Sequence, residues 1–133
     1  MKTIEAVVGI VHDGNWFLLL KKKGNWVGWQ FAQGVIDKKE TEDRAVLREI
    51  KEETGLDAKI ECKLDCKTNY WFVWEDEKIH KNLAFYLLSA KKTNPVILSE
   101  EHSEYQWIKK EKVADMLKYN KEVFEQVLKR YFK

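Results

Sequence analysis

The chain has 133 residues, of which 44% are hydrophobic and 35% are charged. This length and composition predict one domain over residues 1–133 with one core, and they exclude a disordered tail, a collagen-like fibre and a disulfide-stapled miniprotein. The 24 basic and 22 acidic residues give a net charge of +2, which is not the balance of a dedicated nucleic-acid binder. No apolar run approaches the roughly 20 residues that span a bilayer, and the N-terminus lacks a signal-peptide cleavage site. We therefore expect a soluble, cytoplasmic protein without a membrane partner.

The first half of the chain predicts a hairpin followed by a helix. Strands are expected over Thr3–Val11 and Trp16–Lys21, joined by a turn at Asp13-Gly14-Asn15. A loop rich in Gly and Trp follows, and a helix is expected over Glu42–Glu53. Thr41 is a suitable N-cap for this helix, and Gly55 suits the left-handed residue after it.

The second half predicts further strands and a helical C-terminus. The strands are expected over Ala58–Thr68, Asn69–Trp74, Ile79–Ala90 and Tyr105–Lys109. The segment Glu111–Phe132 carries an apolar stripe with helical spacing and is expected to break near Asn120. Cys62 and Cys66 support neither a zinc site nor a disulfide framework, so both are interpreted as ordinary strand cysteines. The pattern favours an α/β sandwich with a mixed sheet.

Three carboxylates on the predicted helix carry the first indication of chemistry. Glu49, Glu52 and Glu53 are spaced i, i+3, i+4, so they project from one face within about one turn. Like charges at this spacing repel, whereas Mg²⁺ prefers oxygen ligands and pairs readily with substrate phosphates. Taken alone, such a string more often forms a solvated Glu- and Lys-rich face.

The spacing around these carboxylates decides between the two interpretations. Gly34 is followed after five residues by Glu40, and seven further residues lead to Arg48-Glu49-Ile50-Lys51-Glu52-Glu53-Thr54-Gly55-Leu56. This is the Nudix box, G-x5-E-x7-R-E-U-x-E-E-x-G-U with U aliphatic, without a departure. The chain therefore resembles the Nudix hydrolase family, which implies a Nudix-type α/β/α sandwich with its catalytic helix at about residues 42–53 and a C-terminal helix.

The resemblance also implies hydrolysis of a nucleotide phosphoanhydride by water under Mg²⁺ or Mn²⁺. Glu49, Glu52 and Glu53 would bind the metal, and the Gly34 carbonyl could complete its shell. Arg48 would hold a neighbouring carboxylate by a bidentate contact, and Glu40 would support the site. The expected catalytic residues are Glu52, Glu53, Arg48, Glu40 and a general base in a late loop.

Candidates for the general base are Glu100, Glu101 and Glu104. Spacing selects Glu101, because Glu101-x3-Tyr105-Gln106-Trp107 is similar to a segment of the branch that cleaves dinucleoside polyphosphates and RNA 5′ ends. His102 could titrate near neutrality, but a lone loop histidine is more often structural or solvated.

The substrate indication comes from the flanking segments. Trp29-Gln30-Phe31-Ala32-Gln33-Gly34 resembles the W-Q-F-P-Q-G of RNA pyrophosphohydrolases and of plant and bacterial diadenosine tetraphosphate hydrolases, with Ala32 in place of the proline. The segment from Leu98 to Trp107 resembles the L-S-x-E-H-x-x-Y-x-W of animal and archaeal diadenosine tetraphosphate hydrolases. These similarities imply a bis(5′-nucleosyl)-tetraphosphatase that splits diadenosine tetraphosphate asymmetrically to ATP and AMP.

Side chains that could bind such a nucleotide are expected outside the box. Phe85, Tyr105 and Tyr119 are candidates for stacking on adenine, and Lys81 and Lys121 for the far phosphates. Three alternatives stay open: removal of pyrophosphate from RNA 5′ ends, hydrolysis of a modified nucleoside triphosphate, and a non-catalytic nucleotide-binding module. The sequence leaves the oligomeric state open.

Overall fold

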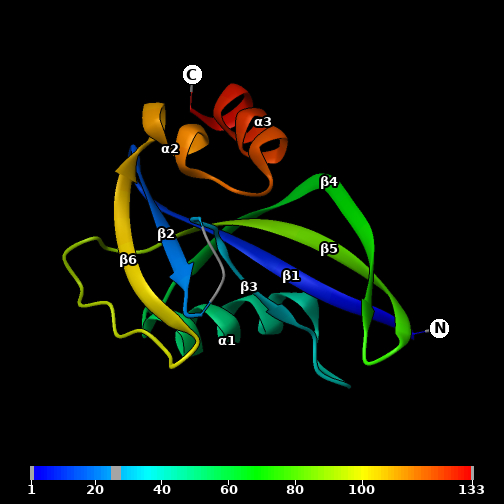
Figure 1. Cartoon of the computed structure of the whole chain (residues 1–133). Coiled ribbons are helices and arrows are strands. Elements are labelled where there is room, and N and C mark those ends of the chain that lie inside the picture. Colours follow the sequence, from blue (N-terminus) through cyan, green and yellow to red (C-terminus); the bar gives the residue numbers. More distant parts are fainter. Residues whose placement is uncertain (1, 25–27, 133) are drawn as a thin grey trace.

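The computed structural model describes residues 2–24 and 28–132, and it shows a mixed β-sheet with helices on both faces (Figure 1). The elements in chain order are β1 (Lys2–Asp13), β2 (Trp16–Lys22), β3 (Ala32–Val35), α1 (Glu42–Thr54), β4 (Lys59–Trp74), β5 (Glu77–Ser89), β6 (His102–Lys109), α2 (Lys110–Met116) and α3 (Lys121–Tyr131). Within the described residues, no helix combines the length and the apolar character needed to cross a membrane.

The sheet opens between β1 and β2, which leaves part of β1 to pair with β3, the strand that carries Gly34. The strand order is β4-β5-β1-β2-β6, with β3 also paired to β1. β1 pairs with β2 only near their shared turn, from His12 to Phe17, and farther along its length it pairs with β3 instead. Gly34 of β3 lies opposite Val7 of β1 in this antiparallel pair. β1 and β5 run parallel, so the sheet is mixed as predicted.

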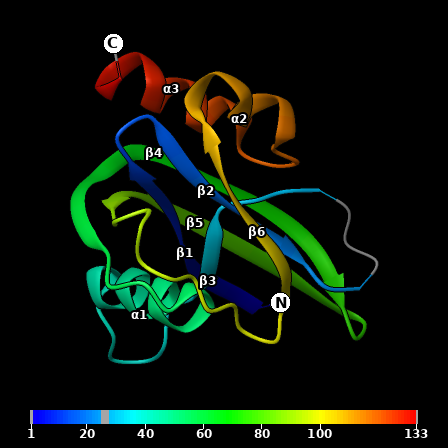
Figure 2. The ribbon, with the colours of Figure 1, turned by 90° about the vertical axis from the view of Figure 1, so that its left-hand side faces the viewer.

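The two faces of the sheet carry separate cores because successive strand residues point to opposite sides. On one face, α1 packs against a cluster that includes Val7, Val11 and Leu20. On the other face, α2 and α3 cover a cluster that includes Val8, Ile10 and Phe124. Figure 2, turned by 90°, shows the sheet between α1 and the α2–α3 pair. The predicted α/β/α sandwich is confirmed.

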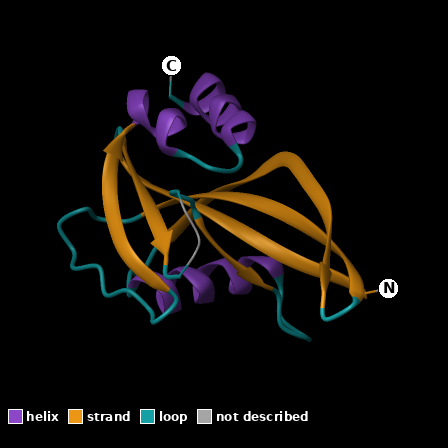
Figure 3. Ribbon diagram, viewed as in Figure 1, coloured by secondary structure: helices purple, strands orange, loops and turns teal. Residues whose placement is uncertain are grey.

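The structure departs from the predicted elements at two strands (Figure 3). β3 lies where a loop was expected, because its four residues are too short to show a period and are held by pairing to β1. The two strands expected over 58–68 and 69–74 are one strand, β4, with a register shift between Lys63 and Lys67 that bends it toward α3.

The predicted helix features are confirmed. The Oγ1 atom of Thr41 accepts from the Arg44 N–H at 3.2 Å, and Gly55 adopts φ 74° and donates its N–H to the Lys51 carbonyl. The break near Asn120 lies between α2 and α3, where Asn120 adopts φ 66°.

Candidate active site

Close contact with β1 fixes the orientation of α1. Val46 and Ile50 are fully buried on the side that faces the sheet. Gly9 of β1 allows this approach, because a Cβ there would lie 2.8 Å from Cδ1 of Ile50. The buried side therefore determines which carboxylates point toward β3 and which face solvent.

Arg48 links the carboxylates of the box. Its Nε and Nη2 atoms donate to the two carboxylate oxygens of Glu40 at 2.6 and 2.9 Å. Nη1 donates to Glu49 at 2.8 Å and to Glu52 at 3.2 Å, and Nη2 also donates to the Val35 carbonyl at 3.0 Å. The bidentate contact with Arg48, together with the Asp37 N–H, lowers the pKa of Glu40 to about 2. The guanidinium thus connects the loop after β3 to α1.

Glu49 is packed against the backbone of β3. A Cβ built on Gly34 would lie 1.9 Å from Cδ of Glu49, so only glycine leaves room for this carboxylate. Burial raises the pKa of Glu49, and the hydrogen bond from Arg48 works in the opposite direction. The charges of Glu52 and Glu101 add to the upward shift.

Glu53 is the most deeply buried carboxylate of the three, with a side-chain exposure of 5%. Burial raises its pKa to about 8, and the charges of Glu49 and Glu101 act in the same direction. A hydrogen bond from the Gln33 N–H and the charge of Lys22 partly offset this effect. By contrast, Glu52 has 59% of its side chain exposed. The α1 carboxylates therefore range from solvent to the interior.

This donor set fits a divalent cation. Three carboxylates and the backbone of Gly34 offer the oxygen ligands that Mg²⁺ prefers. Burial, with a smaller contribution from the neighbouring carboxylates, raises the pKa of Glu49 and Glu53. The absence of a side chain at Gly34 allows the Glu49 carboxylate to pack against β3. Among residues 2–24 and 28–132, no three acidic, imidazole or thiol groups converge into a ready-made metal cage. Glu49 and Glu52 instead share the Arg48 guanidinium.

The loop before β6 brings Glu101 to the same region. The Ile97 N–H donates to the Thr54 carbonyl at 2.8 Å, and the Ser99 N–H donates to the Glu53 carbonyl at 3.2 Å. The charge of Glu101 adds to the upward pKa shift that burial produces at both Glu49 and Glu53. Of the two other candidates for the base, Glu104 pairs with Lys21 at 3.4 Å.

The predicted nucleotide-binding residues do not form one group. Phe85 is wrong as a stacking residue, because it is fully buried in the core under α3 and offers no free ring face. Tyr105 and Tyr119 are each 41% exposed. Tyr105 pairs with Leu20 of the α1-side core, whereas Tyr119 lies between α2 and α3. The two tyrosines thus occupy opposite faces of the sheet and cannot clamp one base.

The structure gives the two predicted lysines different surroundings. Lys81 lies on β5 opposite Tyr70 of β4, with its ammonium 5.9 Å from the centre of the Tyr70 ring. Burial lowers the pKa of Lys81. Lys121 begins α3 and lines an open hollow with Thr68 and Lys118. Lys81 and Lys121 both lie on the side of the sheet that α2 and α3 cover.

Sequence reasoning missed Tyr70 and gave no role to Lys22. Tyr70 is 44% exposed on the α3 side of β4, and only its pairing with Lys81 distinguishes it from the other aromatics. Lys22 ends β2, and its charge lowers the pKa of both Glu53 and Tyr70. Its place in the run Lys21–Lys23 was the one available signal.

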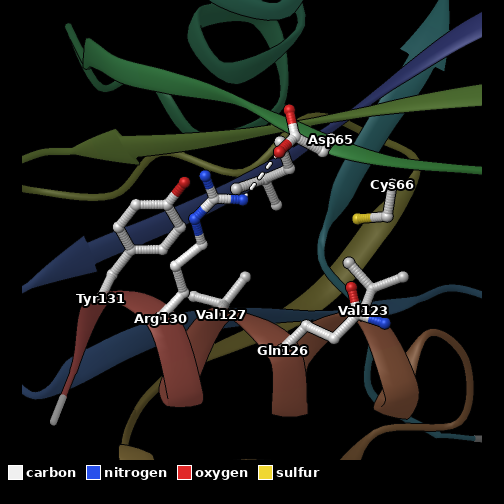
Figure 4. A pocket seen from close by; sticks show the side chains of 8 residues that line it. Asp65, Cys66, Val123, Gln126, Val127, Arg130 and Tyr131 are labelled. Carbon is white, nitrogen blue, oxygen red and sulfur yellow. Dashed lines mark hydrogen bonds and ion pairs between the residues drawn. The ribbon is translucent and has the colours of Figure 1, made fainter.

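A small pocket lies away from these residues, between α3 and the bend of β4 (Figure 4). Its volume is about 40 Å³, and Arg130 pairs across it with Asp65 at 2.7 Å. Such a space holds a few water molecules at most, so it is not a nucleotide site.

A mixed sheet between helices, with an arginine-centred group of glutamates on α1, defines a Nudix-type fold and site. The chain belongs to the NUDIX domain family, whose model matches residues 2–131.

Comparison with curated proteins gives two kinds of match. The RNA pyrophosphohydrolase of Campylobacter jejuni is 29% identical over 117 residues, covering 78% of this chain and 72% of that protein. The ADP-ribose pyrophosphatase of Methanocaldococcus jannaschii is 46% identical over 61 residues, covering 44% of this chain. The first two curated relatives are matched over only 24% and 36% of their own lengths.

Solved structures share the fold at low identity. The Escherichia coli dihydroneopterin triphosphate pyrophosphohydrolase has a TM-score of 0.75 at 18% identity, with 92% of each chain covered. An Ap4A hydrolase of Caenorhabditis elegans has a TM-score of 0.72 at 21% identity, covering 99% of this chain and 98% of that one.

Proposed function

We propose that this chain is a Mg²⁺- or Mn²⁺-dependent hydrolase that cleaves a phosphoanhydride bond of a nucleotide by attack of water. The observation that carries the proposal is the buried carboxylate group of α1, where Glu49 and Glu53 remain close together against β3 despite their repulsion. A solvated Glu-rich helix face would not bury these groups, because burying charge without compensation is costly. A divalent cation supplies that compensation.

The residues of the site have different proposed roles. Glu49, Glu52, Glu53 and the Gly34 carbonyl hold the cation, which when bound neutralises phosphate charge and activates water. Arg48 and Glu40 keep these carboxylates in place. Glu101 accepts the proton of the attacking water; this role is supported by its loop, which is tied to α1, and by the effect of its charge on the pKa of Glu49 and Glu53.

The substrate we favour is diadenosine tetraphosphate, cleaved asymmetrically to ATP and AMP. Exposed aromatic rings lie on both faces of the sheet, with Tyr105 on the α1 side and Tyr70 and Tyr119 on the other. A substrate with a base at each end can use separate stacking positions. Lys22 supplies positive charge that acts on Glu53. Lys81 and Lys121, on the side of the sheet that α2 and α3 cover, are the candidates for the phosphates farthest from the carboxylates.

A second candidate is removal of pyrophosphate from RNA 5′ ends. It is favoured by the match to the Campylobacter jejuni RNA pyrophosphohydrolase, which covers 78% of this chain. An RNA 5′ end presents one base and a triphosphate, so it would need one of the two aromatic positions.

A substrate panel with Mg²⁺ tests the proposal. Diadenosine tetraphosphate, 5′-triphosphorylated RNA and canonical and oxidised nucleoside triphosphates are compared by kcat/KM, with products identified, for wild type and Glu52→Gln. We expect ATP and AMP from diadenosine tetraphosphate and loss of most turnover in Glu52→Gln, which should stay folded because Glu52 is exposed. Preference for RNA would favour the second candidate. No Mg²⁺-dependent hydrolysis of any substrate would indicate a nucleotide-binding module and refute the proposal.

A further inference from the structure

His102 is a buried polar residue next to Glu53, and the sequence analysis assigned it no catalytic or binding role. It begins β6, and only 3% of its surface is exposed. Its Nε2 atom has no hydrogen-bond partner among the residues that the structure describes. Because nearly all buried polar side-chain atoms form hydrogen bonds, this atom requires an explanation.

The imidazole points toward Glu53. Nε2 of His102 lies 3.8 Å from Oε1 of Glu53, and the exposed fractions of the two side chains are 1% and 5%. On the other edge of the ring, Nδ1 lies 3.4 Å from the Ser99 hydroxyl. Because both side chains are buried, water does not compete for their hydrogen bonds, and a hydrogen bond between His102 and Glu53 is favourable wherever the geometry allows it.

The backbone holds the ring in this position. The Ser99 N–H donates to the Glu53 carbonyl at 3.2 Å, and the His102 N–H donates to the Ser99 carbonyl at 3.2 Å. These two hydrogen bonds connect the end of α1, the loop before β6 and the backbone of His102. A contraction of about 1 Å would bring Nε2 and Oε1 to hydrogen-bond distance.

We propose that His102 is a positioning residue for Glu53: Nε2–H of the neutral imidazole donates to the Glu53 carboxylate, and the Ser99 hydroxyl donates to Nδ1. This inference rests on the proposed function, in which Glu53 is a metal ligand. The Gln33 N–H also donates to Glu53. Two fixed donors restrict rotation of the carboxylate and leave its remaining lone pairs for the cation.

The same interaction also fixes the position of the loop that carries Glu101. Glu101 precedes His102 directly, and its carbonyl accepts from the Lys23 N–H at 3.0 Å. Fixing His102 against Glu53 therefore also fixes the backbone that presents the proposed general base.

Metal binding tests the proposal without turnover. Mn²⁺ affinity is measured by electron paramagnetic resonance for wild type, His102→Leu, His102→Gln and Ser99→Ala. We expect His102→Leu to bind Mn²⁺ about 10- to 100-fold more weakly and to regain activity at high Mg²⁺. His102→Gln keeps a donor near Nε2 and should restore most of the affinity, while Ser99→Ala should show a smaller loss. Equal affinity in wild type and a folded His102→Leu would overturn the proposal.

His12→Leu is the matched control, because His12 pairs with Glu61 at a position outside the carboxylate group of α1. It removes a histidine–glutamate contact of the same kind, and we expect unchanged Mn²⁺ affinity. A loss equal to that of His102→Leu would mean that both substitutions act through general stability, which would contradict positioning.

A second readout uses the wild-type protein, so it stands even where a variant fails to fold. The tautomer of His102 is determined by nitrogen-15 NMR of the Mg²⁺-loaded protein labelled at its 3 histidines. The Nε2–H tautomer supports the proposal, and the Nδ1–H tautomer overturns it. A wild-type protein that binds no Mn²⁺ would refute the proposed function, whereas the tautomer reports on the His102–Glu53 contact by itself.

Discussion

The Glu49 carboxyl group fills the space that a side chain at Gly34 would occupy, since a Cβ at that position would lie 1.9 Å from Cδ of Glu49. β3 pairs with β1, and α1 is pressed against β1 through Ile50, so neither element can move away without breaking buried contacts. The glycine of the box is therefore a packing requirement of a carboxylate 15 residues later in the sequence.

Gly34→Ala should consequently displace Glu49 and lower kcat by about 100-fold, because misplacement of a reacting group by about 1 Å costs that much. Steady-state kinetics with saturating Mg²⁺ measures the effect. Gly14→Asn is the matched control: Gly14 has φ 59° with no neighbouring atom near a Cβ, and asparagine tolerates this conformation. Equal activity of Gly34→Ala and Gly14→Asn would contradict the role of the Gly34–Glu49 contact.

Arg48→Lys should lower kcat/KM by about 10- to 100-fold although it keeps the charge, because an ammonium cannot donate to both oxygens of Glu40 while also reaching Glu49. The comparison is Lys51→Ala, which removes an exposed basic residue of α1 that contacts Gly55 and Asp57. We expect wild-type kinetics for Lys51→Ala. Full activity in Arg48→Lys would show that a positive charge at position 48 is enough and that the bidentate contact with Glu40 is not required.

Stability of the metal-free protein should depend on Glu53. Burial and the charge of Glu49 raise the pKa of this carboxyl group from 4.5 to about 8. Between these pH values the native state holds a proton that the unfolded state has released, so the free energy of unfolding falls as pH rises and levels off above pH 8. Glu53→Gln removes this contribution and should be more stable than wild type at alkaline pH, by on the order of 5 kcal/mol.

Urea unfolding of both proteins at several pH values, with chelator present, measures this difference. Mg²⁺ should then restore the alkaline stability of wild type and have little effect on Glu53→Gln. A constant difference between the two proteins across the pH range would contradict the raised pKa.

Tyr70→Ala should raise KM for the nucleotide by about 10- to 100-fold with little change in kcat, because stacking on a base contributes about 1–3 kcal/mol. Tyr70→Phe keeps the ring and should behave as wild type. Phe85→Ala, at the fully buried position, should instead lower the free energy of unfolding by about 3–5 kcal/mol. A normal KM in Tyr70→Ala would exclude Tyr70 from substrate binding.

Local sequence determined the features that depend on neighbours along the chain. The spacing from Gly34 to Leu56 identified the box, and Thr41 and Gly55 set the ends of α1 because capping uses groups within one turn. The break at Asn120 and the mixed sheet between helices were predicted for the same reason: periodicity and turn residues act over short distances.

Tertiary structure alone decided which side of the sheet each residue faces and what covers it. Pairing with β1 created β3 and placed Phe85 in the core, and pairing between β4 and β5 brought Tyr70 beside Lys81. Nothing in their local sequence distinguishes these aromatics. Adjacent carboxylates likewise received opposite environments, since Glu52 faces solvent while Glu53 is enclosed by β3 and the loop before β6. Burial and register arise from contacts between segments far apart in the chain, and these contacts set the pKa of Glu53 and its approach to His102.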